Sequence, residues 1–76
     1  MKPANSKTFR RKLGKRIRQI RKEQKISQSQ LAFESGLSRE QIYRAESGSK
    51  NMTIDTLLSI ASAFEIPFVK LFDFEE

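Results

Sequence analysis

The sequence contains no cysteine and no histidine among its 76 residues. Without cysteine the chain can form neither a disulfide framework nor a thiolate metal site, which fits a cytoplasmic protein. Without histidine it lacks the commonest general base and metal ligand at neutral pH. Its carboxylates are scattered and it has no glycine-rich phosphate loop. We therefore expect no enzymatic activity, no metal and no cofactor.

Long hydrophobic runs are also missing from the sequence. No segment approaches the length of a membrane span, and the basic N-terminus lacks the apolar region of a signal peptide. Sustained alternation of apolar and polar residues, which would indicate β-strands, is absent. A hydrophobic share of 37% with 32% charged residues is that of an ordinary globular chain. The length suits one small domain without a separate ligand-binding domain, so we expect no small-molecule ligand.

Acidic residues are scarce in the first third of the chain. Residues 1–25 hold eleven of the fifteen Lys and Arg residues and one acid, whereas the remaining 51 residues hold four bases and eight acids. The net charge of +6 therefore divides into about +10 for the first part and about −4 for the rest. A folded chain with one strongly basic segment favours a polyanionic partner, nucleic acid first and an acidic membrane surface second.

Apolar residues at helical spacing predict a first helix from about Thr8 to Gln24. Gly14 costs about 1 kcal/mol relative to alanine inside a helix, which suggests that another backbone approaches closely there. We expect residues 1–8 to form a flexible basic arm and residues 9–76 to form the domain. The apolar stripe is Phe9, Leu13, Ile17 and Ile20; the opposite, solvent-facing ridge is Lys7, Arg11, Lys15, Arg18 and Lys22; and Arg10 and Arg21 lie on one flank.

Two capping patterns, eleven residues apart, predict two short helices. In each pattern a serine is followed three residues later by a glutamine, which is a capping box, and each helix ends at a glycine. The predicted helices are Gln28–Ser35 and Arg39 to about Ser47. The capping pairs are Ser27 with Gln30 and Ser38 with Gln41, and the glycines are Gly36 and Gly48.

Two more helices are predicted in the last third of the chain. Thr53 caps a fourth helix, with a nearly continuous apolar face, that runs to about Phe64. Pro67 suits the first position of a fifth, short helix with the sequence PFVKLF. Five helices joined by short loops predict an all-α fold, a compact five-helix bundle that contains a helix-turn-helix.

The third predicted helix has little to bury. Ile42 and Ala45 lie on one side of it, and the opposite side is polar. Arginine can bond guanine O6 and N7 together, glutamate can accept from cytosine N4, and tyrosine can lie against a thymine methyl. We therefore expect this side to read bases of double-stranded DNA. The predicted base-reading residues are Arg39, Glu40, Tyr43 and Arg44.

Residues suited to DNA phosphates flank this polar side. The N-termini of the two short helices offer unpaired backbone N–H groups and a positive dipole end. A polar loop follows the third helix, where a flanking phosphate would pass. The predicted phosphate-binding residues are Gln28, Ser29, Ser38, Lys50 and Asn51.

The segment from Leu13 to Phe72 resembles the phage repressor and Cro-like (XRE-type) helix-turn-helix family. The matching features are in register over nearly the whole chain: Arg21, Ser27–Gln28, Leu31–Ala32, Gly36, Ile42, Glu46, Gly48, Asn51 and TIDTLLSIASAFEI. The compact form is similar to the controller proteins of restriction–modification systems. The resemblance implies a lambda-repressor-like DNA-binding domain and a sequence-specific transcriptional regulator.

The resemblance also implies roles for individual residues. Gln28 matches the position whose side chain and helix N-terminus hold a phosphate, and the three charged residues of the polar side match base-reading positions. Arg21 and Glu46 match a structural ion pair that ties the first helix to the end of the recognition helix. Met52 stands where proline is frequent, so the loop path is less fixed. Ala45 replaces a larger residue, so the recognition helix either sits closer in or is less well anchored.

The C-terminal segment carries more apolar surface than one short helix can bury. We expect a homodimer whose interface is formed by Phe68, Leu71, Phe72 and Phe74. Such a dimer places two recognition helices about one DNA turn, roughly 34–36 Å, apart on a palindromic operator. Phe33, which points away from the inner face of its helix, either joins this interface or packs on the fourth helix.

Two other functions compete with the regulator. The alternative is a protein-interaction module, such as an antitoxin, that binds a partner through its apolar C-terminal surface. A homodimer favours the regulator, whereas a monomer with an exposed apolar patch favours the module. Peripheral membrane binding through the basic first helix is a third possibility, but the apolar stripe of that helix is needed for the core.

Overall fold

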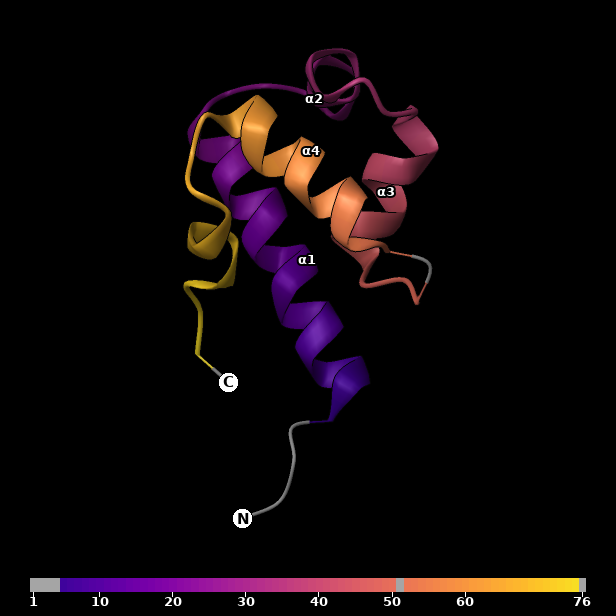
Figure 1. Cartoon of the computed structure of the whole chain (residues 1–76), viewed down its shortest axis with the longest axis vertical. Helices are drawn as coiled ribbons and strands as arrows, with labels where there is room; N and C mark the ends of the chain where they lie inside the picture. Colours follow the sequence, from indigo (N-terminus) through magenta and orange to yellow (C-terminus); the bar gives the residue numbers. More distant parts are fainter. Residues whose placement is uncertain (1–4, 51, 76) are drawn as a thin grey trace.

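The computed structural model describes residues 5–50 and 52–75. Within these ranges the chain forms four α-helices and one short 3-10 helix, and no β-strand (Figure 1). The all-α expectation is therefore confirmed. The elements are α1 (Ser6–Glu23), α2 (Gln28–Ser35), α3 (Arg39–Ser47), α4 (Ile54–Phe64) and the 3-10 helix η1 (Phe68–Phe72).

The first helix begins two residues earlier than expected. Asn5 caps α1, because its side chain accepts a hydrogen bond from the backbone N–H of Thr8 at 3.1 Å. The residues from Ser6 to Thr8 are consequently helical and do not belong to the flexible arm expected over residues 1–8. Residues 1–4 of that arm lie outside the described residues.

The last expected helix is a 3-10 helix and not an α-helix. Pro67 precedes η1 without a side-chain cap, and the Lys70 N–H donates to the Pro67 carbonyl, three residues back, at 2.9 Å. Five residues are enough for this tighter winding but give an α-helix little more than one turn. The expected five-helix bundle is thus a bundle of four α-helices closed by η1.

The core is built around α1. In Figure 1 α4 crosses in front of α1, while α3 and the C-terminal segment lie on its two sides. Phe9 of α1 is only partly buried, and its ring lies against Phe74 with centroids 5.3 Å apart. The C-terminal segment therefore folds back onto α1. The buried apolar side chains are Leu13, Ile17, Ile20, Leu31, Ala32, Ile42, Ala45, Leu57, Ile60, Ala61, Phe64 and Leu71.

Gly14 lies where α1 and α3 meet. A Cβ atom built on Gly14 would lie 2.8 Å from the carbonyl oxygen of Ala45 and closer still to that of Glu46, whereas ordinary contacts begin at 3.4 Å. The two backbones are therefore in contact, as the unfavourable glycine in mid-helix predicted. Ala45 is fully buried at this contact. Two effects of the small Ala45 side chain were expected, and the structure supports the first: α3 packs closer to α1.

Candidate nucleic-acid interface

The two helices of the helix-turn-helix start at serine caps. Ser38 forms the complete capping box: its hydroxyl accepts from the Gln41 N–H at 3.1 Å, and its own N–H donates to the Gln41 side chain at 2.8 Å. Ser27 caps α2 in the same way with the Gln30 N–H at 3.0 Å. The Gln30 side chain, however, donates to Glu34 at 2.6 Å. The first capping box is thus only half formed: Gln30 turns its amide N–H to the Glu34 carboxylate, in a charge-assisted hydrogen bond, and does not offer its oxygen to the Ser27 N–H.

Helix α3 has one buried side and one exposed side. Ile42 and Ala45 are fully buried against the domain. On the opposite side Tyr43 is 61% exposed. We call this side the outer face of α3; it consists of Arg39, Glu40, Tyr43 and Arg44, all four exposed. The four residues expected to read bases therefore share one accessible surface.

A buried carboxylate joins α1, α2 and α3. Glu46 accepts from Arg21 Nε at 2.6 Å and from Arg21 Nη2 at 3.1 Å, so the ion pair is bidentate. The remaining guanidinium nitrogen, Nη1, donates to the Ile26 carbonyl at 3.0 Å. Gln28 Nε2 also donates to Glu46, at 3.1 Å. The two residues expected to form a structural ion pair do lie together, and the same carboxylate fixes the start of α2 relative to α3.

The residues expected to bind phosphates lie at the ends of these helices. Gln28 donates one amide N–H to Glu46, and its second amide N–H can donate to another acceptor. Ser29 is exposed in the first turn of α2, and Lys50 is exposed shortly after α3. The Ser38 oxygen is occupied by the cap, but its hydroxyl can still donate. Asn51 lies outside the described residues.

Arg10 holds the C-terminal end of α3. Its Nε atom donates to the Gly48 carbonyl at 3.1 Å, and its Nη1 atom donates to Ser6 Oγ at 3.3 Å. A cation at a helix C-terminus is favourable because the helix dipole is negative there. The sequence did not predict this contact. The one signal available was that Arg10 shares a flank of α1 with Arg21, which also binds the end of α3.

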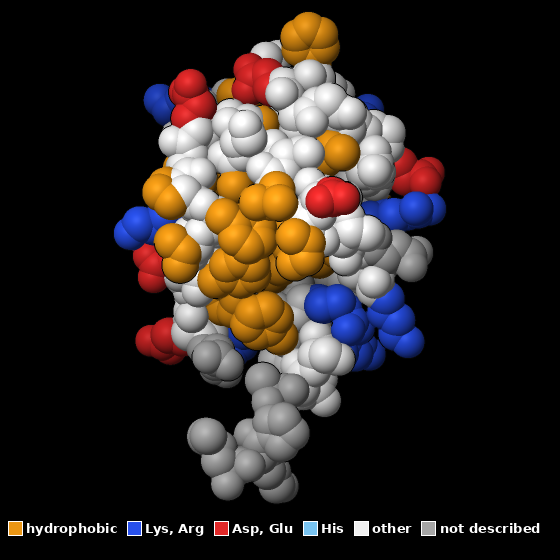
Figure 2. All heavy atoms as spheres, in the orientation of Figure 1, with side chains coloured by type: hydrophobic (Ala, Val, Ile, Leu, Met, Phe, Trp, Pro, Cys, Tyr) orange, Lys and Arg blue, Asp and Glu red, His pale blue; other side chains and the backbone are white. Residues whose placement is uncertain are grey.

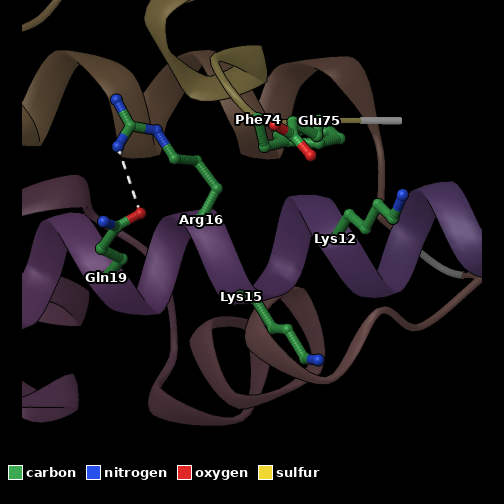
Figure 3. A pocket seen from close by; sticks show the side chains of 6 residues that line it. All are labelled: Lys12, Lys15, Arg16, Gln19, Phe74 and Glu75. Carbon is green, nitrogen blue, oxygen red and sulfur yellow. Dashed lines mark hydrogen bonds between the residues drawn. The ribbon is translucent and has the colours of Figure 1, made fainter.

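The cations of the solvent-facing ridge do not contribute to the contacts described above. Lys7, Arg11, Lys15, Arg18 and Lys22 are all exposed. Beside the ridge, a shallow hollow lies between α1 and the C-terminal segment; its lining residues are Lys12, Lys15, Arg16, Gln19, Phe74 and Glu75. Arg16 turns toward Gln19, at 3.3 Å, and Lys15 points away (Figure 3). Because these cations diverge, the hollow does not form an anion site. No described helix is long and apolar enough to cross a membrane.

Apolar side chains gather on the face of the molecule where α4 lies (Figure 2). Ile54 and Leu58 of α4 are 61% and 46% exposed, and Val69 of η1 is 69% exposed. Leu71, by contrast, is fully buried in its own domain. Its expected place in a dimer interface is therefore wrong, because the fold already covers it. Phe33 is 82% exposed, so it does not pack on α4 as one expectation had it.

Comparison with known proteins identifies relatives of this chain. The helix-turn-helix family profile matches residues 17–71, from within α1 to within η1. The control protein C.BamHI of Bacillus amyloliquefaciens is 37% identical over 62 residues, covering 80% of this chain and 76% of that protein. An HTH-type transcriptional regulatory protein of Methanocaldococcus jannaschii is 35% identical over 63 residues, covering 83% of this chain. This chain spans only 20% of the length of the archaeal protein.

A solved structure has the same fold. The crystal structure of the restriction-modification controller protein C.AhdI from Aeromonas hydrophila matches with a TM-score of 0.78 and 37% sequence identity. The match covers 82% of this chain and 94% of that one. The residues matched by the family profile include Arg21, Gln28, the whole of α3 and Lys50, so they contain the surface described above.

Proposed function

The chain belongs to the helix-turn-helix (XRE-type) family of DNA-binding transcriptional regulators, and we propose that it acts as a homodimer that reads a palindromic operator with α3. The observation that carries this proposal is the division of α3 into two sides. Ile42 and Ala45 are fully buried, whereas the outer face is exposed and contributes little to the fold. Arginine, glutamate and tyrosine on one helix face suit the base edges of the major groove.

Phosphate contacts hold α3 in register in this proposal. Gln28 donates its second amide N–H to one phosphate, and Ser29 lies beside it at the start of α2. Ser38 and Lys50 contact phosphates near the two ends of α3, and Asn51 is proposed with them. Such contacts carry no sequence information but fix the orientation of the helix on the duplex. Support for this arrangement comes from Glu46, which binds Gln28 at 3.1 Å and so links the phosphate contacts to α3.

A second copy of the chain would bind at an apolar face formed by α4 and η1. We define the apolar face as Ile54, Leu58, Phe68, Val69 and Phe72. Three of these side chains are between 46% and 69% exposed, and α4 and η1 are in contact. Exposed apolar side chains on neighbouring elements are typical of association sites. Phe74 lies beside the apolar face, where it packs on Phe9, and remains part of the proposed interface.

Selection of bound sites from random duplex DNA, together with light scattering of the protein, tests the proposal. We expect an enriched palindrome whose half-sites lie about one helical turn apart, and the mass of a dimer in solution. An unenriched pool would contradict sequence-specific binding. A monomer that enriches a single half-site would keep the DNA-binding face and contradict the dimer.

A further inference from the structure

Glu40 and Arg44 form an ion pair on the outer face of α3. Arg44 Nη2 lies 2.7 Å from Glu40 Oε1, one helical turn away, and the two side chains are 50% and 69% exposed. The Arg21–Glu46 pair, by contrast, is buried and joins two helices. An exposed pair within a single helix adds little to folding stability. Its position on the surface proposed to face DNA points to a role in binding.

A carboxylate on a DNA-facing surface opposes binding to phosphates. The outer face carries two cations, Arg39 and Arg44, and Glu40 neutralises one of them at contact distance. The attraction of α3 for a phosphate backbone is therefore weaker than its arginines alone would produce, and this reduction applies to every sequence. A base edge can accept hydrogen bonds from Arg44 without breaking the ion pair with Glu40. Such a contact is not weakened by the carboxylate in the way that a phosphate contact is.

The chemistry of the guanidinium group allows such a contact. Arginine has five N–H donors in one plane, and Nη2 alone carries two of them. Glu40 Oε1 lies beside Nη2 as an ion pair. Two N–H donors that the ion pair leaves available can meet guanine O6 and N7. A phosphate at the edge of the groove requires Arg44 either to leave Glu40 or to bring the carboxylate close to a second anion.

We propose that Glu40 is a positioning residue that orients Arg44 toward a guanine and lowers the affinity of α3 for other DNA. The inference rests on the DNA-binding function proposed above and deepens it, because it places a G·C pair opposite Arg44 in each half-site. Glu40 then acts through Arg44, so a change at Glu40 alters the preference at the base pair that Arg44 reads.

The first test compares Glu40→Gln with a charge-matched control, Glu65→Gln. Glu65 caps the C-terminal end of α4, whereas α3 lies near the opposite end of that helix (Figure 1). Affinities for the selected operator and for a scrambled duplex are measured over a series of salt concentrations, after thermal unfolding has shown each variant to be folded. We expect Glu40→Gln to bind the scrambled duplex about three- to tenfold more tightly, with a salt slope steeper by about one.

The ratio of operator to scrambled affinity should fall about tenfold in Glu40→Gln and stay unchanged in Glu65→Gln. An unchanged ratio and slope in Glu40→Gln would overturn the inference while leaving the DNA-binding function intact. If the wild-type protein enriched no sequence at all, the proposed function would fail and the inference with it. The two failures are therefore distinguishable.

The second test asks whether Glu40 acts through Arg44. Site selection is repeated with Glu40→Gln, with Arg44→Gln and with the double variant. We expect both single variants to relax the preference at the same G·C pair, and the double variant to resemble Arg44→Gln. A loss of preference at a different base pair in Glu40→Gln, or a further loss in the double variant, would mean that Glu40 reads a base directly. Either result would overturn the positioning role.

Discussion

Replacing Gly14 with alanine should destabilise this protein, although the same change in the middle of a helix normally stabilises. The added methyl group would lie 2.8 Å from the Ala45 carbonyl oxygen and closer to that of Glu46. Ordinary contact begins at 3.4 Å, and the closer contact, to the Glu46 carbonyl oxygen, would require α3 to retreat from α1 by about 1 Å. Both obstructing atoms belong to the backbone, so no change of rotamer relieves the contact.

The retreat of α3 is resisted by two arginines of α1. Arg10 binds the Gly48 carbonyl at 3.1 Å, and Arg21 binds Glu46 at 2.6 Å. Overpacking of this kind costs about 1–3 kcal/mol, and stretching these hydrogen bonds adds about 1 kcal/mol. Improved helix propensity recovers about 1 kcal/mol. We therefore expect Gly14→Ala to lower the free energy of unfolding by about 1–3 kcal/mol.

Urea unfolding followed by circular dichroism, at one fixed protein concentration, measures this change; the concentration is fixed because dimerisation contributes to apparent stability. Lys15→Ala is the matched control, since Lys15 is the exposed neighbour on the same helix and should change stability by no more than about 0.5 kcal/mol. A Gly14→Ala protein more stable than wild type by about 1 kcal/mol would refute the backbone contact between α1 and α3.

Further predictions concern substitutions at five other positions. Lys25 and Glu65 have φ angles of 60° and 59°, in the left-handed region. Glycine at either position should raise the free energy of unfolding, measured in urea, by about 0.5–1 kcal/mol. The steric strain of a side chain in this region is larger than the extra conformational entropy that glycine loses on folding. Leu58→Glu places a charge on the apolar face and should convert the dimer to a folded monomer in light scattering. Arg44→Ala should weaken operator binding by about 1–3 kcal/mol and relax the base preference at one base pair per half-site. Lys50→Ala should weaken binding to all sequences alike and lower the slope of affinity against salt concentration by about one. Fluorescence anisotropy measures both effects. Unchanged affinity and preference in Arg44→Ala would contradict reading by α3.

Local signals were sufficient to predict the helices of the helix-turn-helix. The bounds of α2 and α3 match the expectations because each helix starts at a serine and ends before a glycine, and caps act over three or four residues. Competition between local partners was harder to predict. The Gln30 side chain can either accept from the Ser27 N–H or donate to the Glu34 carboxylate, and it donates to Glu34. Asn5 caps α1 although no acidic or apolar pattern marks that boundary.

Contacts between distant segments could not be predicted from periodicity. A helical wheel separates the buried side of α3 from its outer face, so the exposure of the base-reading candidates followed from the sequence. A helical wheel does not show which distant segment of the chain packs against the apolar side of a helix. Leu71 is apolar and lies near the C-terminus, but it is buried because the segment after α4 folds back on α1. The bond from Arg10 to Gly48 likewise depends on where α3 lies in space.

The way α3 is held has a consequence for the basic first helix. Because α3 buries few side chains, its orientation depends on Gly14 and on polar contacts with α1. Arg10 and Arg21 therefore serve the fold, because Arg10 donates to the Gly48 carbonyl and Arg21 pairs with the Glu46 carboxylate. The exposed cations of α1 create a positive potential, which in the proposed complex attracts DNA from a distance without reading its sequence. In the proposed complex, sequence preference comes from the outer face of α3, where a single carboxylate, that of Glu40, lies among the arginines.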